Sequence, residues 1–369
     1  MLEIPLYKVH MPPDVSSALP EVLASGSIAA GPNVARFEQL FGEYLGNPRV
    51  TATGDISTSL TLCLYLAGVR PGDEVLMSPL VCLSTSCPVS NLFATIRWCD
   101  VDPLTGNLDP ADLERRITPR TKAIVVYHWA GNPADLDRIH AIARVYDIPV
   151  IEDAGEALGA TYRGKRIGAT GADYTVFSFY PNRHITTIEG AAIACAREED
   201  NEKLRWLKRY GIHQPSFRTS DGEINPASDI PVAGWNSYMN HVAGTLGVLQ
   251  MPHLPAIVDR HQSNGQFYDH ALAGISGLTV LRRPMDSLSA YWVYTFLAEN
   301  RDNLMRKLRN SGIGASKVHL RNDGYSCFAS QEYDLPGVEH FSAHSLSIPS
   351  GWWVSNVARE RIVDIIAER

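Results

Sequence analysis

Two polar residues that could carry chemistry follow predicted buried strands. Asp153 comes directly after the run Pro149-Val150-Ile151-Glu152, and Ser178 lies near the end of a second run. Parallel sheets bind ligands beyond the carboxyl ends of their strands, so both side chains are expected at one such edge. A buried carboxylate needs a cationic or hydrogen-bond-donating partner. Asp153 is therefore predicted either to hold a cationic ligand atom or to cap the element that follows it.

Arg183 and His184 follow Ser178 within a few residues and are the candidate catalytic residues. A guanidinium remains protonated at ordinary pH, so Arg183 offers a permanent positive charge and is a poor base. An imidazole gains and loses a proton near neutral pH, so His184 is the group here that could move protons. The side chains of adjacent loop residues need not point the same way.

A third candidate group precedes a predicted apolar helix over Leu60–Leu66. The turn before that helix contains Asp55, Ile56, Ser57 and Thr58. Backbone amides and hydroxyls at a helix start are suited to bind phosphate, and Ser57 and Thr58 could supply them. The alternative is that a serine or threonine of this turn simply caps the helix.

The elements that must position these residues alternate between strands and helices. Strand-like runs end near residues 78, 101, 127, 152 and 179, and helical patterns lie between them, as in 109–117 and 133–146. This alternation predicts a mostly parallel sheet with helices on both faces. A polar, irregular stretch follows at about 215–235, then a helix at about 237–249. We place a division near residue 250, giving a large domain (1–250) and a smaller α+β domain (251–369).

Composition excludes several classes of partner. The net charge is −7 and the basic residues are scattered, which argues against nucleic acid or an anionic membrane. The apolar runs are too short to span a bilayer. The six cysteines show neither CxxC spacing nor a disulfide-scaffold density, so we expect reduced thiols, no metal site and a cytoplasmic location.

The segments 151–157 and 177–190 together resemble the cofactor segment of a known family, the DegT/DnrJ/EryC1/StrS sugar aminotransferases. The family pattern is Ser-Phe, three residues, then the lysine that forms a Schiff base with pyridoxal 5′-phosphate (PLP). Counted from Ser178, that position holds Arg183, which cannot form the imine. Weaker matches at 26–32, 70–75 and 348–353 extend the resemblance over nearly the whole chain.

The resemblance implies a fold-type-I PLP-enzyme architecture, a homodimer with active sites at the interface, and a noncovalently held PLP or pyridoxamine 5′-phosphate (PMP). It also implies a role for each of nine residues. Asp153 would pair with the pyridine nitrogen, with Glu156 near the ring hydroxyl and Leu83 against the ring face; Ser57, Thr58 and Ser178 would contact the phosphate; Asn240 would reach the neighbouring subunit's cofactor; and His319 and Arg321 would lie near the sugar substrate. Without the resemblance, Glu156 could face solvent, Leu83 could be core and Asn240 could be a helix cap.

Arg183 leaves three functions open. The first is an aminotransferase acting on a keto sugar, often nucleotide-linked, in antibiotic or polysaccharide biosynthesis, with its lysine replaced. The second is a PMP-dependent sugar dehydratase, a branch in which histidine takes the lysine position; His184 matches the residue after that base. The third is a noncatalytic protein of the same fold, in which Arg183 pairs with Asp153 or binds an anion. Ile56 and Asp55 in the phosphate turn, together with Leu83, favour some divergence.

Overall fold

A seven-stranded sheet forms the centre of the computed structural model, which describes residues 3–328 and 334–368. The strand order is β1-β9-β8-β5-β4-β2-β3, and within this described sheet β9 alone runs against its neighbours. The strands are β1 (Val50–Thr53), β2 (Glu74–Met77), β3 (Thr95–Trp98), β4 (Thr121–Tyr127), β5 (Val150–Asp153), β8 (Tyr174–Ser178) and β9 (Ala191–Cys195). The mostly parallel sheet predicted from the strand–helix alternation is confirmed.

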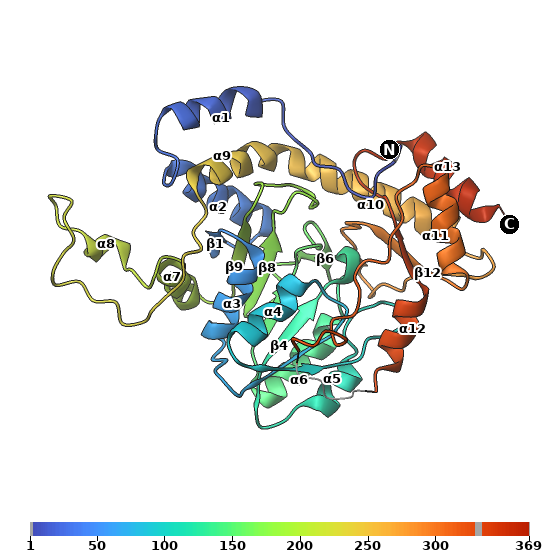
Figure 1. Cartoon of the computed structure of the whole chain (residues 1–369), viewed down its shortest axis with the longest axis horizontal. Helices are drawn as coiled ribbons and strands as arrows, with labels where there is room; N and C mark the ends of the chain where they lie inside the picture. Colours follow the sequence, from blue (N-terminus) through green and yellow to red (C-terminus); the bar gives the residue numbers. More distant parts are fainter. Residues whose placement is uncertain (1–2, 329–333, 369) are drawn as a thin grey trace.

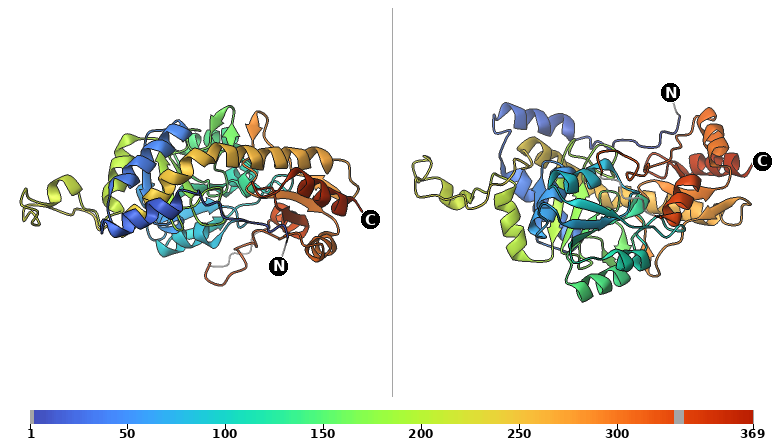
Figure 2. Two further views of the ribbon diagram at one scale, coloured as in Figure 1. Left: turned by 90° about the horizontal axis from the view of Figure 1, so that it is seen from above. Right: turned by 60° about the horizontal axis from the view of Figure 1, so that its bottom comes forward.

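Helices cover both faces of this sheet (Figures 1 and 2). One face packs against α2 (Pro32–Leu45), α6 (Leu136–Tyr146) and α9 (His241–Gln250); the other packs against α3 (Ile56–Leu66), α4 (Leu83–Asn91) and α7 (Glu198–Leu207). Three further elements of this part are α1 (Val15–Ala24), α5 (Pro110–Arg116) and the short helix η1 (Trp129–Gly131).

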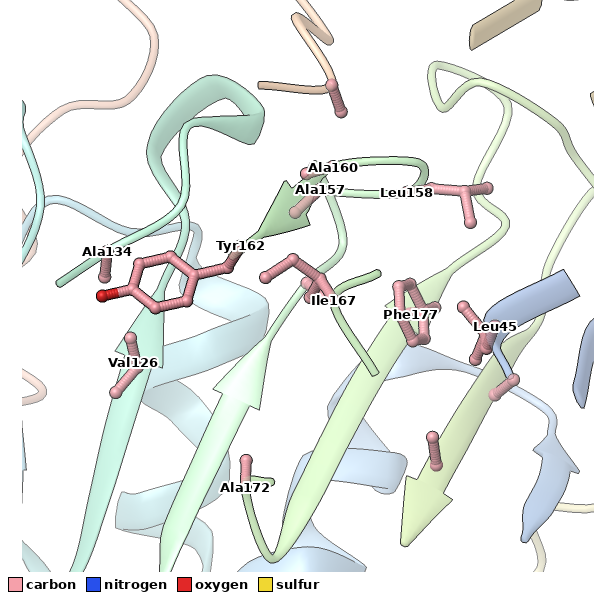
Figure 3. Close-up of a cluster of buried hydrophobic side chains, with 14 of the residues drawn as sticks. Leu45, Val126, Ala134, Ala157, Leu158, Ala160, Tyr162, Ile167, Ala172 and Phe177 are labelled. Carbon is pink, nitrogen blue, oxygen red and sulfur yellow. The ribbon is translucent and has the colours of Figure 1, made fainter. Parts of the chain in front are cut away.

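Successive strand residues alternate between the two hydrophobic clusters, as a pleated strand requires. On β5, Val150 belongs to the cluster beneath α6, whereas Ile151 belongs to the cluster beneath α3 and α4. The same alternation directs Glu152 to the α6 face and Asp153 to the α3–α4 face. Figure 3 shows part of the α6-face cluster, where the ring of Tyr162 lies beside Ala134 and Val126.

The C-terminal part is built on a second sheet, in the order β10-β12-β13. Its elements are η2 (Met251–His253), α10 (Leu254–Ala271), β10 (Leu278–Val280), β12 (Tyr294–Ala298), α11 (Arg301–Asn310), α12 (Pro336–His344), β13 (Ser345–Ile348) and α13 (Asn356–Ala367). A three-stranded sheet of β6 (Thr161–Tyr162), β7 (Lys165–Arg166) and β11 (Ser287–Leu288) links the two parts.

The division expected near residue 250 falls between α9 and η2 and stays a prediction. The long helix α10 bridges the two parts because its beginning packs in the main core and its end packs in the C-terminal one. Leu254 and Val258 belong to the former cluster, and Tyr268 belongs to the latter. The N-terminal segment also contacts the C-terminal part, since Ile4 forms a parallel bridge with Ile313.

An arm of irregular chain between α7 and α9 projects from the body (Figures 1 and 2). It contains the four-residue helix α8 (Gln214–Phe217) and exposes Ile224, Ile230 and Val232. This segment matches the polar, irregular stretch expected at about 215–235. Within residues 3–328 and 334–368, no helix is both long enough and apolar enough to cross a membrane.

Candidate functional site

Three elements converge at Gly155, just beyond the carboxyl end of β5. A β-carbon placed there would lie 3.1 Å from Ile56 Cδ1, 3.2 Å from Asp153 Oδ1 and 3.4 Å from Ser178 Cβ. The start of α3 and the ends of β5 and β8 therefore meet at one point. The structure brings together Asp153, Ser178 and the helix start that precedes Ser57 and Thr58, as the parallel-sheet argument predicts.

Asp153 is a buried carboxylate whose two hydrogen bonds come from neutral groups. Thr85 Oγ1 donates to Oδ2 at 2.7 Å, and the amide of Gly155 donates to Oδ1 at 3.0 Å. Burial raises the pKa of Asp153 above its ordinary value, although these bonds and the charge of Arg183 act in the opposite direction. A cation placed against this carboxylate would relieve the cost of its burial.

Arg183 lies close enough to influence Asp153 but pairs with a different carboxylate. Its Nη1 is 3.2 Å from Glu156 Oε1, and its guanidinium carbon lies 4.5 Å from the centre of the Trp292 ring. Burial alone would lower the pKa of Arg183, but the negative charge of Glu156 and other nearby groups holds that pKa above its ordinary value. Arg183 is therefore a fixed cation. Its Nε is buried and has no hydrogen-bond partner among the described residues.

Glu156 connects Arg183 to a second basic residue. His319 Nε2 lies 2.9 Å from Glu156 Oε1, and the amide of Ala130 donates to Oε2 at 2.9 Å. Burial would raise the pKa of Glu156, but His319 and Arg183 outweigh it and the pKa lies below its ordinary value. Glu156 is buried, so the solvent-facing alternative for this residue is wrong. The hydroxyl of Tyr127 lies 3.2 Å from His319 Nε2 and extends the network.

His184 points away from this network, although it follows Arg183 directly in sequence. Its Nε2 lies 3.1 Å from the carbonyl oxygen of Ala290. The centre of its ring lies 4.5 Å from that of His261, and the two ring planes are tilted by 50°. Burial, the neighbouring His261 and the charge of Arg183 together lower the pKa of His184 well below its ordinary value. In this position His184 is a neutral packing residue between the two parts of the chain.

The start of α3 is capped by Asp55 rather than by a serine or threonine. Asp55 Oδ1 accepts the amide of Thr58 at 2.7 Å, and Oδ2 accepts the Thr58 hydroxyl at 2.8 Å. Both donor groups of Thr58 are thus already engaged. Ser57 lies in the first turn, where its carbonyl accepts the Thr61 hydroxyl. The helix begins at Ile56, four residues earlier than the sequence indicates.

The remaining candidates lie around this centre. Leu83 opens α4 and is 44% exposed, so the alternative that it belongs to the core is wrong. Asn240 caps α9 by accepting the amide of Ala243 at 2.9 Å. Arg321 donates two hydrogen bonds to Asp323, and among the described residues its carboxylate partner is Asp323 rather than Glu156 or Asp153.

Comparison with known proteins places the chain in a family. The model of the DegT/DnrJ/EryC1/StrS aminotransferase family matches residues 12–367. The chain belongs to this family. It is 31% identical over 340 residues to the spore coat polysaccharide biosynthesis protein SpsC of Bacillus subtilis, covering 89% of this chain and 87% of that protein.

Two solved structures show the same architecture. The sugar aminotransferase CalS13 from Micromonospora echinospora is 38% identical, with a TM-score of 0.93 over 99% of each chain. AtS13 from Actinomadura melliaura is 34% identical, with a TM-score of 0.94 over 100% of this chain and 99% of that one. The chain therefore has the fold-type-I PLP aminotransferase architecture predicted from its sequence.

The residues of this DegT/DnrJ/EryC1/StrS chain fit the family cofactor at its ring end. Buried Asp153, whose donors are neutral, offers the carboxylate that a protonated pyridine nitrogen requires. Counted from Ser178, Arg183 is expected at the position of the family lysine, and its guanidinium could not form an imine with a bound cofactor. The start of α3 fits less well, because Asp55 already binds Thr58 there.

Three aromatic residues of the site could not be recognised as site residues from the sequence. Trp292 stacks on Tyr7 with ring centres 4.9 Å apart, and its Nε1 donates to the carbonyl of Asn182 at 2.5 Å. It thereby fixes the loop that holds Arg183. Tyr127 ends β4 and reaches His319. Trp292 and His319 come from the C-terminal part and Tyr7 from the N-terminal segment, so only the folded chain assembles this set.

Proposed function

We propose that the chain binds PLP or PMP noncovalently and uses it for amine–carbonyl chemistry on a keto sugar, with transamination as the reaction. The observation that carries this proposal is Asp153 at the carboxyl end of β5, a buried carboxylate to which no cation of the described chain is directly bonded. The names of CalS13, a sugar aminotransferase, and SpsC, a polysaccharide biosynthesis protein, support a role in antibiotic or polysaccharide synthesis. The sugar is often nucleotide-linked in this family.

When bound, the cofactor supplies a ring that withdraws electrons from the carbon next to the reacting nitrogen. The chain's own residues would then orient the cofactor ring and move protons. Asp153 would hold the ring nitrogen in its protonated form, and Arg183 places a positive charge beside Glu156. His319, which is part-exposed and bonded to Glu156, is the group we propose for proton transfer in place of the lysine.

Dehydration of the sugar is the alternative within the same chemistry, and it also needs a histidine base. His184 does not serve, because its ring faces His261 and the Ala290 carbonyl. A noncatalytic role is the third alternative. The pairing expected for that case, Arg183 with Asp153, is replaced by a bond from Arg183 to Glu156, which leaves Asp153 free to hold the ring.

We further propose a cytoplasmic homodimer. The projecting arm exposes Ile224, Ile230 and Val232, which a second copy would cover. The arm leads into α9, whose first turn is capped by Asn240, so the same contact would bring Asn240 toward the partner's pocket. The cysteines are unpaired in the described chain, as a reducing compartment requires.

The test compares the native chain with Arg183→Lys. Each protein is mixed with PLP, treated with borohydride and examined by absorbance and mass spectrometry. We expect native protein to bind PLP reversibly and Arg183→Lys to gain a covalent adduct that borohydride traps. Arg36→Lys, the same change at an exposed position on α2, controls for adventitious labelling of a new lysine.

The outcomes separate the candidate functions. Transamination with glutamate by Arg183→Lys, but not by native protein, identifies a diverged aminotransferase. Consumption of a keto sugar by native protein with PMP identifies a lysine-free reaction, and loss of a hydroxyl from the product identifies dehydration. Failure of both proteins to bind PLP or PMP would overturn the proposed function.

A further inference from the structure

Asp55 binds both donor groups of one residue at the start of α3. Its two carboxylate oxygens accept the amide and the hydroxyl of Thr58, at 2.7 and 2.8 Å. The side chain of Asp55 therefore satisfies one of the orphan amides of the helix and places a negative charge at its positive end. The interaction is internal, and it occupies two of the donor groups at this helix start that could otherwise bind an external anion.

This helix start belongs to the site described above. Ile56, the first residue of α3, reaches the point where Asp153 and Ser178 meet beside Gly155. The charge of Asp55 is felt by a second carboxylate on the loop between β8 and β9: burial first, and then Asp55, raise the pKa of Glu189. Two carboxylates that influence each other thus lie near the start of α3.

The charged groups around Asp153 therefore differ between the start of α3, where Asp55 is negative, and the loop that holds Arg183. In that loop Arg183 is buried, and its Nε has no hydrogen-bond partner among the described residues. A phosphate that used the Thr58 donors would have to displace Asp55 from them, and any phosphate at the start of α3 would lie near the charge of Asp55. A carboxylate within a few ångströms of a phosphate near a protein surface repels it strongly enough to change affinity by about tenfold or more.

We propose that the carboxylate of Asp55 competes with the cofactor's phosphate for the start of α3. As a consequence, this chain recognises its cofactor by the ring and binds the phosphorylated and unphosphorylated forms with similar affinity. This inference rests on the proposed function, since it presupposes that the ring binds at Asp153. Asp55 is then a specificity residue for the cofactor, and the cofactor is held differently from one whose phosphate is anchored by free helix amides.

The test measures the affinities of PMP and of pyridoxamine, which lacks only the phosphate, by equilibrium dialysis. Both ligands are amines, so neither forms adducts with surface lysines. In the native chain we expect the two dissociation constants to agree within about threefold. In Asp55→Ser, which keeps a good helix cap but removes the charge, PMP should bind about tenfold more tightly while pyridoxamine is unchanged.

Asp135→Ser is the matched control. Asp135 caps α6, a helix of the same length as α3, and likewise accepts the amide three residues on, that of Arg138 at 3.3 Å. Its substitution should change neither affinity. Asp55→Asn, an equally good cap, provides a second uncharged variant whose folding can be compared by thermal unfolding.

The results separate this inference from the proposed function. If native protein already prefers PMP by tenfold, or if PMP affinity is unchanged or weaker in both Asp55 variants, Asp55 does not oppose the phosphate and the inference fails while cofactor binding stands. If no variant binds either ligand, the proposed function is wrong, and the inference about Asp55 is wrong as well. Tighter PMP binding in both Asp55 variants, but not in Asp135→Ser, supports the inference.

Discussion

Two adjacent carboxylates on β5, Glu152 and Asp153, are equally buried but lie in opposite surroundings. Glu152 faces α6, where Thr170 Oγ1 and Thr175 Oγ1 donate to it at 3.0 and 3.2 Å. His128 Nε2 lies 3.5 Å from it as well. Asp153 faces α3 and α4 and receives bonds from one hydroxyl and one amide.

Their pKa values are displaced in opposite directions. Burial would raise the pKa of Glu152, but the interaction with His128, helped by His140 and Thr170, lowers it below the ordinary value. Burial dominates at Asp153 and raises its pKa. The comparison shows that depth of burial does not identify a functional carboxylate. Among the described residues, Asp153 differs from Glu152 in having no imidazole or other basic side chain bonded to it.

The largest expected effect comes from Glu152→Gln. The amide would turn a donor toward His128 and leave buried polar groups without acceptors, so the free energy of unfolding should fall by about 3 kcal/mol. PMP affinity should stay within about twofold. Urea unfolding and equilibrium dialysis measure the two quantities.

Glu199→Gln is the control for that substitution. Glu199 lies on α7 and pairs with Lys203 at 2.6 Å in an exposed position, so its loss should change stability by no more than about 0.5 kcal/mol. A Glu152→Gln protein as stable as this control would show that the Glu152 network is not structural, and the contrast with Asp153 would be lost.

Asp153→Asn should give the reverse pattern. Replacing an ionised group that its surroundings disfavour should leave the stability of the cofactor-free protein unchanged or raise it by about 1 kcal/mol. PMP affinity should fall about thirtyfold, because the ring nitrogen loses its charged partner. Retained PMP affinity with lowered stability would instead identify Asp153 as the cap of the segment that follows β5.

The positions of these carboxylates could be predicted from the sequence, but their partners could not. A strand followed by a helix places Asp153 and Ser178 at the carboxyl edge, and the period of two separates Glu152 from Asp153. The partners of Arg183 come from elsewhere: Trp292 lies more than a hundred residues downstream, and only tertiary packing brings it to the loop.

At two places the directions of side chains and the start of a helix could not be predicted from the sequence. Arg183 and His184 are adjacent, yet one faces Glu156 and the other faces His261, because the irregular loop sets each side-chain direction separately. At α3 the charge of Asp55 is visible in the sequence. Its capture of both Thr58 donors depends on the helix starting at Ile56, and helix ends are the least predictable features of a sequence.

The smallest expected effect, and the sharpest test of the contrast, is the pH dependence of stability in the two β5 variants. Asp153 has a folded pKa above its ordinary 3.8. Below pH 3.8 it is protonated in both folded and unfolded states, so native protein and Asp153→Asn should be equally stable. As pH rises through 3.8 toward the folded pKa, the unfolded chain ionises first. Native protein should therefore lose about 1 kcal/mol relative to Asp153→Asn.

Glu152 should behave as the mirror image, because its folded pKa lies below the ordinary 4.5. Its ionised form stabilises the fold fully above pH 4.5, and that contribution disappears as pH falls through the folded pKa. The deficit of Glu152→Gln should thus be greatest at neutral pH and shrink in acid, whereas the advantage of Asp153→Asn should be greatest at neutral pH and vanish in acid. Urea unfolding of the three proteins across this range measures both curves. If both substitutions lower the free energy of unfolding at neutral pH, the folded chain stabilises both ionised carboxylates. Burial of Asp153 would then give no reason to expect a bound cation beside it.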